Sequence, residues 1–115
     1  MKYERDYLQD MLEYLDSAAA FTTDGREAFM RDRKTQFAVI RAYEVIGEIA
    51  KRLPGAMREA NPQIDWQKLI NFRDFLAHNY ERVILNNVWA AVEDLPILRA
   101  AVEALLASLP EDDTL

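Results

Sequence analysis

Residues 39–53 read VIRAYEVIGEIAKRL, and the order of apolar and charged side chains in this stretch decides the fold class. Apolar residues recur every three or four positions, which is the period of an α-helix. They form one broad face: Val39, Ala42, Tyr43, Ile46, Ile49, Ala50 and Leu53. The charged residues lie on nearly the opposite face: Arg41, Glu44, Glu48 and Arg52. Phe37 and Val45 fall on this charged side too, which is typical of a helix covered by the core on one side and by a partner or a site on the other.

The same period predicts helices on the N-terminal side of this stretch. A first helix is expected over residues 4–21, ended by the capping residues and the glycine of 22–25. The helix that contains residues 39–53 is expected to start after Gly25, with room for a bend. It ends at a Pro-Gly pair, because proline cannot continue the hydrogen-bond ladder.

On the C-terminal side, residues 54–64 are expected to form a connection, and Asp65 can cap the next helix, which should fade near residues 78–80. A final helical region is expected after Asn86 or Asn87, with a kink or a break where Pro96 interrupts it. These elements predict an all-α protein, an antiparallel bundle of four to five helices.

The composition narrows the class of protein. The chain has 115 residues, half of them hydrophobic, which fits one packed domain over residues 1–110 followed by an acidic tail over 111–115. The absence of cysteine excludes disulfides, thiolate zinc sites and a cysteine nucleophile. With one histidine, no metal site is expected, and no cofactor motif is present. A charged N-terminus and the lack of a long apolar run predict a cytoplasmic protein that does not contact a membrane.

The net charge of −6 argues against a protein that coats nucleic acid through charge alone. A local excess of positive charge nevertheless runs through four residues: Arg26, Arg31, Arg33 and Lys34. Such a run is either a solvated helix face or a small phosphate-contacting patch at the rim of a site formed elsewhere. Both alternatives stay open.

The residues best suited to chemistry lie in the segment RDFLAHNY, residues 73–80. Histidine titrates near neutrality and can take or give a proton, and arginine can hold phosphate oxygens with two hydrogen bonds. These two groups suffice for metal-free RNA cleavage, in which the ribose 2′-OH attacks its own phosphodiester. An ideal helix places Arg73 and His78 about 140° apart around its axis. They converge only if His78 lies in a frayed last turn, or if two chains share one cleft.

A structural explanation of the same residues is also available. A histidine near a helix C-terminus commonly bonds the last carbonyl groups, and a tyrosine such as Tyr80 is commonly a half-buried packing residue. Asp74 is expected to pair with Arg73 only awkwardly, because neighbouring side chains on a helix point apart. Glu44 and Glu48 are expected to form salt bridges with Arg41 and Arg52 rather than to hold a metal, since no Glu-x-x-His partner exists.

The segment Arg73-x-x-x-x-His78-x-Tyr80 resembles the Rx4HxY motif of the HepT toxins, within the HEPN superfamily of helical nucleases. The surrounding sequence agrees with this resemblance in three places: residues 41–50 resemble the family's "IGE" helix, residues 61–66 its lead into the motif helix, and residues 88–98 its C-terminal helix. The match covers nearly the whole chain in the order that the family shows.

The resemblance implies a homodimer with a shared cleft, and a metal-independent ribonuclease toxin acting on tRNA or mRNA through Arg73 and His78. It also implies a partner, a cognate MntA-type nucleotidyltransferase antitoxin that neutralises the toxin by transferring AMP to Tyr80. Glu48 and Asn79 are supporting candidates, and Glu48 is expected to hold Arg73 or His78 in place from the neighbouring helix. Two alternatives remain: a non-catalytic helical module that partners a nucleotidyltransferase, and a structural dimerisation bundle.

Overall fold

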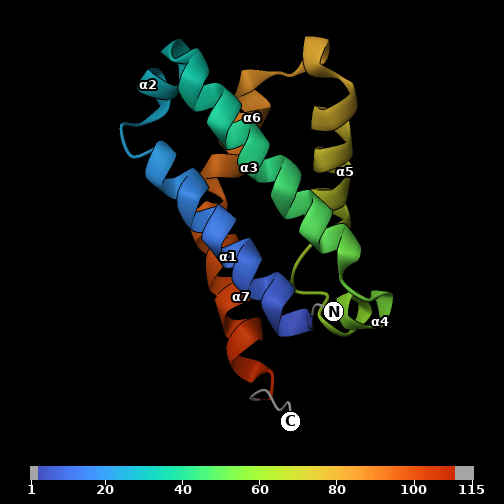
Figure 1. Cartoon of the computed structure of the whole chain (residues 1–115). Coiled ribbons are helices and arrows are strands. Elements are labelled where there is room, and N and C mark those ends of the chain that lie inside the picture. Colours follow the sequence, from blue (N-terminus) through green and yellow to red (C-terminus); the bar gives the residue numbers. More distant parts are fainter. Residues whose placement is uncertain (1–2, 111–115) are drawn as a thin grey trace.

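The computed structural model describes residues 3–110, apart from the side chain of Tyr80. Within these residues the chain forms seven α-helices and one 3-10 helix, with no β-strand (Figure 1). The predicted all-α bundle is therefore confirmed. The acidic tail predicted for residues 111–115 lies outside the described residues.

The first helix, α1 (Glu4–Phe21), has the predicted bounds. At its start the main-chain N–H of Tyr3 donates to the Asp6 carboxylate at 3.1 Å. At its end the Thr22 hydroxyl donates to the carbonyl of Ala18 at 2.9 Å. Gly25 follows with a φ of 93°, a conformation that favours glycine.

The long helix expected after Gly25 is divided in two, α2 (Arg26–Arg31) and α3 (Arg33–Arg52). Asp32 makes the break, because its extended backbone caps α3: its carboxylate accepts from the N–H of Lys34 at 3.0 Å and from the Thr35 hydroxyl at 2.7 Å. The buried amide of Gln36 then donates to the last carbonyls of α2, which ties the two helices together.

Residues 54–64, predicted as a connection, contain a short helix, α4 (Gly55–Ala60). The motif helix α5 (Trp66–His78) ends where the sequence predicts, and a 3-10 helix, η1 (Tyr80–Arg82), follows it. The final region is divided into α6 (Leu85–Glu93) and α7 (Leu95–Ser108), which confirms the break at Pro96.

The predicted start of the final region was wrong. α6 begins at Leu85 with Ile84 as its N-cap residue and without a side-chain cap, so Asn86 and Asn87 lie inside its first turn. The Asn86 side chain does not cap the helix but bonds to α2: its side-chain oxygen accepts from the guanidinium of Arg26 at 2.6 Å.

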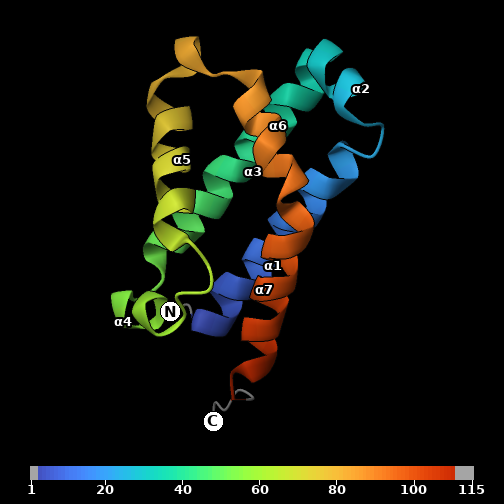
Figure 2. The ribbon, with the colours of Figure 1, turned by 180° about the vertical axis from the view of Figure 1, so that it is seen from behind.

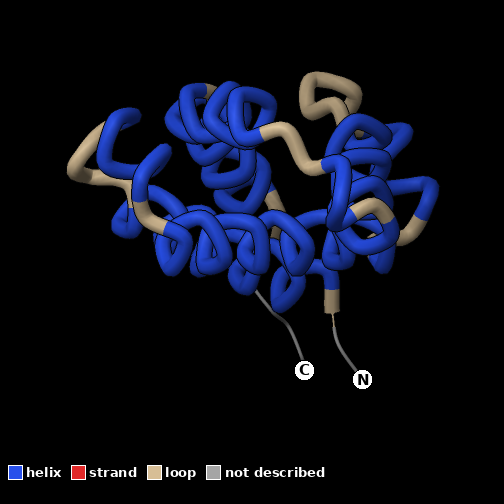
Figure 3. The backbone as a smooth tube through the Cα atoms, turned by 90° about the horizontal axis from the view of Figure 1, so that it is seen from above, coloured by secondary structure: helices blue, strands red, loops and turns tan. Residues whose placement is uncertain are grey.

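α3 lies at the centre of the molecule, with α1 on one side and α5 on the other, both antiparallel to it (Figure 1). Seen from behind, α7 runs along α1, and α6 lies against α3 (Figure 2). The end-on view shows helices surrounding one interior, joined by short loops (Figure 3). Buried apolar side chains from all seven α-helices share this interior, among them Leu8, Phe29, Val39, Met57, Ile70, Val88 and Val102.

None of the helices formed by residues 3–110 combines the length and the apolar run that crossing a bilayer requires.

Candidate active site

α5 carries the motif residues at its C-terminal end, and local contacts fix where it starts. The Asp65 carboxylate accepts from the main-chain N–H of Lys68 at 3.0 Å, as the sequence predicts for an N-cap. The indole N–H of Trp66 donates to the carbonyl of Asn61 at 2.9 Å. These bonds position the helix that presents Arg73 and His78.

Gly47 lets α5 lie close against α3 at the level of Arg73. A Cβ atom at position 47 would overlap the Cβ of Arg73 and would lie 2.7 Å from the carbonyl oxygen of Leu69. Only a glycine fits this contact without moving one of the helices. The guanidinium of Arg73 is thereby brought beside the charged side of α3.

The Arg73 side chain is 25% exposed and lies between two carboxylates. One guanidinium nitrogen lies 3.3 Å from a Glu48 oxygen, and the other donates to Asp74 at 3.0 Å. The prediction that Asp74 would pair only awkwardly with Arg73 was wrong, because the long arginine side chain reaches its sequence neighbour. The third nitrogen, Nε, is buried and makes no hydrogen bond within the described residues.

Both carboxylates are shared with a second cation. Glu48 accepts from the guanidinium of Arg52 at 3.0 Å, and this bond, followed by the charge of Arg73, lowers the pKa of Glu48. Asp74 accepts from Lys51 at 3.4 Å, and its pKa is lowered first by the hydrogen bond from Arg73 and then by Lys51. Arg73 therefore belongs to an alternating network of charges between α3 and α5.

The His78 side chain is exposed at the last residue of α5. Its Nδ1 lies 2.9 Å from the carbonyl oxygen of Asp74. A carbonyl only accepts, so Nδ1 carries the proton and donates, and Nε2 of the neutral ring keeps its lone pair. This bond to a last-turn carbonyl is the one expected of a structural histidine, and it also prepares Nε2 to act as a base.

Asp74 is thus bonded to both motif residues, through its carboxylate to Arg73 and through its carbonyl to His78. No contact between the Arg73 and His78 side chains is present within the described residues. α5 stays helical through His78, so a frayed last turn does not bring the two together.

The two other motif candidates lie just beyond α5. The Asn79 amide donates to the carbonyl of Phe75 at 3.2 Å, so it closes the end of α5. Tyr80 begins η1, and its side chain lies outside what the structure describes. Glu48 contacts Arg73 and not His78.

A polar hollow of about 620 Å³ opens beside Arg73. Its walls come from α1, α3 and α5: Tyr14, Arg41, Glu44, Val45, Glu48, Arg52, Arg73 and Ala77. The predicted salt bridges of Glu44 with Arg41 and of Glu48 with Arg52 are confirmed, at 3.3 Å and 3.0 Å. Among the described residues, no three His, Asp or Glu side chains gather to hold a metal ion.

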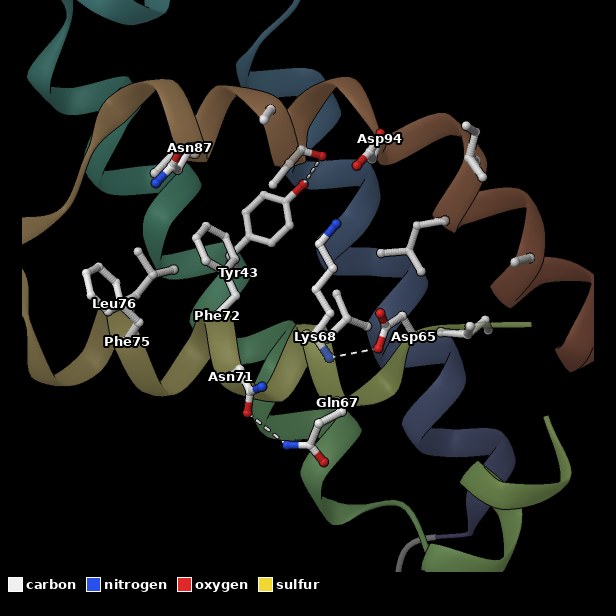
Figure 4. A pocket seen from close by; sticks show the side chains of 18 of the residues that line it. Tyr43, Asp65, Gln67, Lys68, Asn71, Phe72, Phe75, Leu76, Asn87 and Asp94 are labelled. Carbon is white, nitrogen blue, oxygen red and sulfur yellow. Dashed lines mark hydrogen bonds between the residues drawn. The ribbon is translucent and has the colours of Figure 1, made fainter. Parts of the chain in front are cut away.

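A larger, mostly apolar groove of about 1060 Å³ lies between α5 and the pair α6 and α7 (Figure 4). Tyr43 and Ala91 line this groove, and the phenol of Tyr43 donates a hydrogen bond to the carbonyl of Ala91 at 2.8 Å, which joins α3 to α6. Three large apolar side chains of the groove are well exposed: Phe75 at 39%, Ile84 at 56% and Ile97 at 74%.

Three residues of this site were not found from the sequence. Gly47 is the contact point for Arg73, and a glycine within an otherwise regular helical pattern was its signal. Asp74 was expected to pair with Arg73 only awkwardly. Lys51 gave no signal in the sequence, because its partner Asp74 lies 23 residues further along the chain.

Proteins that are named as probable or putative ribonucleases are similar to this chain over most of its length. The family model described as "Ribonuclease HepT-like" matches residues 11–105. "Probable ribonuclease HepT" of Thermococcus cleftensis is 41% identical over 103 residues, which cover 88% of this chain and 94% of that protein. "Putative RNase MJ0125" of Methanocaldococcus jannaschii is 36% identical over 107 residues, which cover 91% and 92%. No solved structure matches the chain. The family resemblance expected from the motif is confirmed.

Proposed function

The chain belongs to the HepT-like family of ribonucleases, and we propose that it is a metal-independent RNA-cleaving toxin, with Arg73 and His78 as its catalytic residues. One observation carries the assignment to these residues. The bond from His78 Nδ1 to the Asp74 carbonyl leaves Nε2 as a lone-pair nitrogen on an exposed ring, on the same helix as the ion-paired Arg73 and five residues after it. The relatives named as RNases support RNA as the substrate class.

The proposed reaction needs only these side chains and the RNA. Nε2 of His78 takes the proton of a ribose 2′-OH, and the 2′ oxygen attacks the adjacent phosphorus. The bond to the 5′ oxygen breaks, and that oxygen takes the proton that His78 Nε2 has accepted, which leaves a 2′,3′-cyclic phosphate, a 5′-hydroxyl end and a neutral histidine. The guanidinium of Arg73 stabilises the charge that develops on the phosphoryl oxygens.

A homodimer is part of this proposal, because Arg73 and His78 make no contact within the described part of one chain. The apolar groove supports a second copy as its occupant. Phe75 and Ile84 flank the His78 segment in the chain, and Ile97 extends the same surface onto α7. Exposed apolar patches of this kind mark protein interfaces. A copy bound here brings a second His78 to the edge of the shared cleft.

The cleavage test uses the purified full chain, tRNA and mRNA substrates, and EDTA in excess. The wild type should shorten RNA and leave DNA of the same sequence intact, because DNA lacks the 2′-OH. His78→Ala should lower the rate by about 10²-fold or more, the typical contribution of a general base. Arg73→Lys should also lose activity, since a lysine cannot offer two parallel hydrogen bonds. An unmodified wild-type protein, verified by mass, that leaves RNA uncut would favour the non-catalytic binding module.

Neutralisation by a nucleotidyltransferase antitoxin is the second part of the proposal. Tyr80 follows His78 by two residues, and its phenol oxygen would attack the α-phosphorus of ATP and release pyrophosphate. The added adenylate brings bulk and negative charge beside groups that must receive an RNA phosphate. Tyr80→Phe should therefore stay toxic when the neighbouring nucleotidyltransferase is co-expressed, whereas wild-type growth should recover. Equal growth of the two strains would contradict this mode of control.

A further inference from the structure

The outer side of α3 carries a row of exposed and half-buried side chains. Positions three or four residues apart lie on one face of a helix, and this face holds Arg33, Phe37, Arg41, Val45, Glu48 and Arg52, of which Val45 and Glu48 are half-buried. In Figure 1, α3 has α1 on one side and α5 on the other. From Arg33 to Glu48 it spans about 22 Å at 1.5 Å per residue.

Phe37 is the unusual member of this row. Its side chain is 59% exposed, although it lies on a helix whose opposite face supplies much of the core. The guanidinium carbon of Arg33 lies 5.1 Å from the centre of the ring, a cation–π contact. An aromatic ring held beside an arginine and open to solvent can stack on a nucleobase.

The charge around Phe37 has the opposite sign to that of the whole chain. Residues 26–41 contain five basic and two acidic side chains, while the full chain has a net charge of −6. Arg31, Arg33 and Lys34 are exposed, and Arg41 is 74% exposed. Positive charge is thus gathered at one part of an acidic protein, which favours an anionic ligand there.

The row leads to the candidate active site. Four residues of its C-terminal part form one wall of the polar hollow beside Arg73: Arg41, Val45, Glu48 and Arg52. The α2–α3 corner and the His78 end of α5 also lie at the same end of the molecule in both side views (Figures 1 and 2). A strand that follows the row therefore arrives at the Arg73 guanidinium.

We propose that this face of α3 binds a single-stranded segment of the RNA substrate: Phe37 stacks on an unpaired base, Arg33 and Arg41 contact phosphates, and the strand continues to Arg73. The proposal rests on the ribonuclease function above and adds the form of the substrate. A base inside a duplex is already stacked on its neighbours, so the ring selects unpaired RNA. Arg41 keeps unused N–H donors for a phosphate, since one contact to Glu44 occupies only part of its five.

Binding is measured by fluorescence anisotropy with a labelled, unstructured RNA oligonucleotide and the full chain carrying His78→Ala, which keeps the RNA intact. Adding Phe37→Ala should weaken binding about tenfold, the loss expected for one base–aromatic stack. The matched control is Phe21→Ala, which removes an aromatic side chain that is 48% exposed on α1 and should change nothing. The RNA paired into a duplex should bind more weakly and should not respond to Phe37→Ala.

The salt dependence tests the phosphate contacts separately. Arg33→Ala with Arg41→Ala should lower the slope of log affinity against log salt by about 1.4, that is, about 0.7 for each lost contact. Arg99→Ala, on α7, where the guanidinium is paired with Asp16 and Glu103, should leave the slope unchanged.

Three results would overturn the proposal. If the wild type cleaves RNA and the α3 variants bind and cleave RNA like their parents, this face of α3 does not bind the substrate, and the ribonuclease function stands. If the variants bind RNA normally but no longer bind the nucleotidyltransferase, the face is a protein interface. If the wild type neither binds nor cleaves any RNA, both the ribonuclease function and the RNA-binding role of this α3 face are wrong.

Discussion

Arg73 is held by carboxylates that stay ionised through the neutral range. Glu48 and Asp74 have a lowered pKa in the folded chain, caused first by their hydrogen bonds from Arg52 and from Arg73, respectively. A group whose pKa is lowered by folding stabilises the fold above its unfolded pKa, near 4 for these groups, and this stabilisation is lost as the pH falls through the folded value. The network around Arg73 should therefore hold at pH 5–8 and come apart in acid, in roughly the range below pH 4.

Glu48→Gln tests this network at one residue. The amide keeps the shape but removes the charge that holds Arg73 from α3, so cleavage should slow by about two- to fivefold, the scale of a partly exposed ion pair. The loss of thermal stability between pH 5 and pH 3 should also be smaller than in the wild type, because one titrating carboxylate is gone.

The control for Glu48→Gln is Glu103→Gln, which breaks a comparable ion pair four residues from its arginine on α7, away from the site. It should leave the cleavage rate unchanged. A Glu48→Gln enzyme with full activity and the wild-type acid response would show that Arg73 does not depend on this carboxylate.

How much of the site was predictable differs from residue to residue. Arg73 and His78 were singled out because a single histidine and a nearby arginine stand out in a chain with few reactive side chains; their catalytic role was predicted from the resemblance to the HepT motif and stays a prediction. The roles of Asp74 and Lys51 were not found, because they depend on where a flexible arginine side chain folds and on which residues a neighbouring helix brings close. Sequence spacing on one helix contains neither kind of information.

At the scale of elements, helix bounds were predictable where a capping residue or a proline marks them. The bounds of α1 and the break at Pro96 follow such signals. The break between α2 and α3 was expected only as a bend, because Asp32 acts through hydrogen bonds that an aspartate makes equally well on a helix surface. Asn86 and Asn87 failed as N-caps for the converse reason: these favourable residue types stand two and three residues after the N-cap position, which Ile84 occupies.

The contact between α3 and α5 depends on the missing side chain of Gly47. In Gly47→Ala the new Cβ would overlap Arg73 and press on the Leu69 carbonyl, so the helices must separate or Arg73 must move. Overpacking of this kind costs about 1–3 kcal/mol, which should lower the Tm by several degrees and reduce cleavage because Arg73 is displaced. Thermal unfolding and the RNA cleavage assay measure the two effects.

Gly55→Ala is the matched control for this substitution. Gly55 begins α4, and a Cβ there meets no atom within 4 Å, so the Tm and the cleavage rate should stay as in the wild type. If Gly47→Ala behaves like Gly55→Ala, the close approach of the two helices is not required for the position of Arg73.

At the scale of the whole molecule, the two sides of α5 have different surfaces. The side beside α3 carries the ionic network and the polar hollow, and the side facing α6 and α7 carries the apolar groove (Figure 4). His78 is the last residue of α5. A protein that buries the groove against a second copy therefore leaves the charged face of α3 free for RNA.

The dimer can be tested through Ile97, the most exposed of the large apolar side chains in the groove. Ile97→Asp places a charge on the surface proposed to be buried between copies, which costs several kcal/mol without a partner but little in a monomer exposed to water. Sedimentation equilibrium should show a dimer for the wild type and a monomer for Ile97→Asp. Cleavage should fall on the order of 10²-fold, because the monomer cannot bring Arg73 and His78 to one phosphate.

Two measurements separate this result from simple misfolding. The circular dichroism spectrum of Ile97→Asp should match that of the wild type, and Phe21→Asp, on α1 away from the groove, should remain a dimer. A monomeric wild type that cleaves RNA at full rate would mean that one chain completes the site, and Arg73 and His78 would then have to meet through a rearrangement at the end of α5. A dimeric Ile97→Asp would place the interface on another face, because a charge at the centre of an apolar contact cannot be accommodated without a partner.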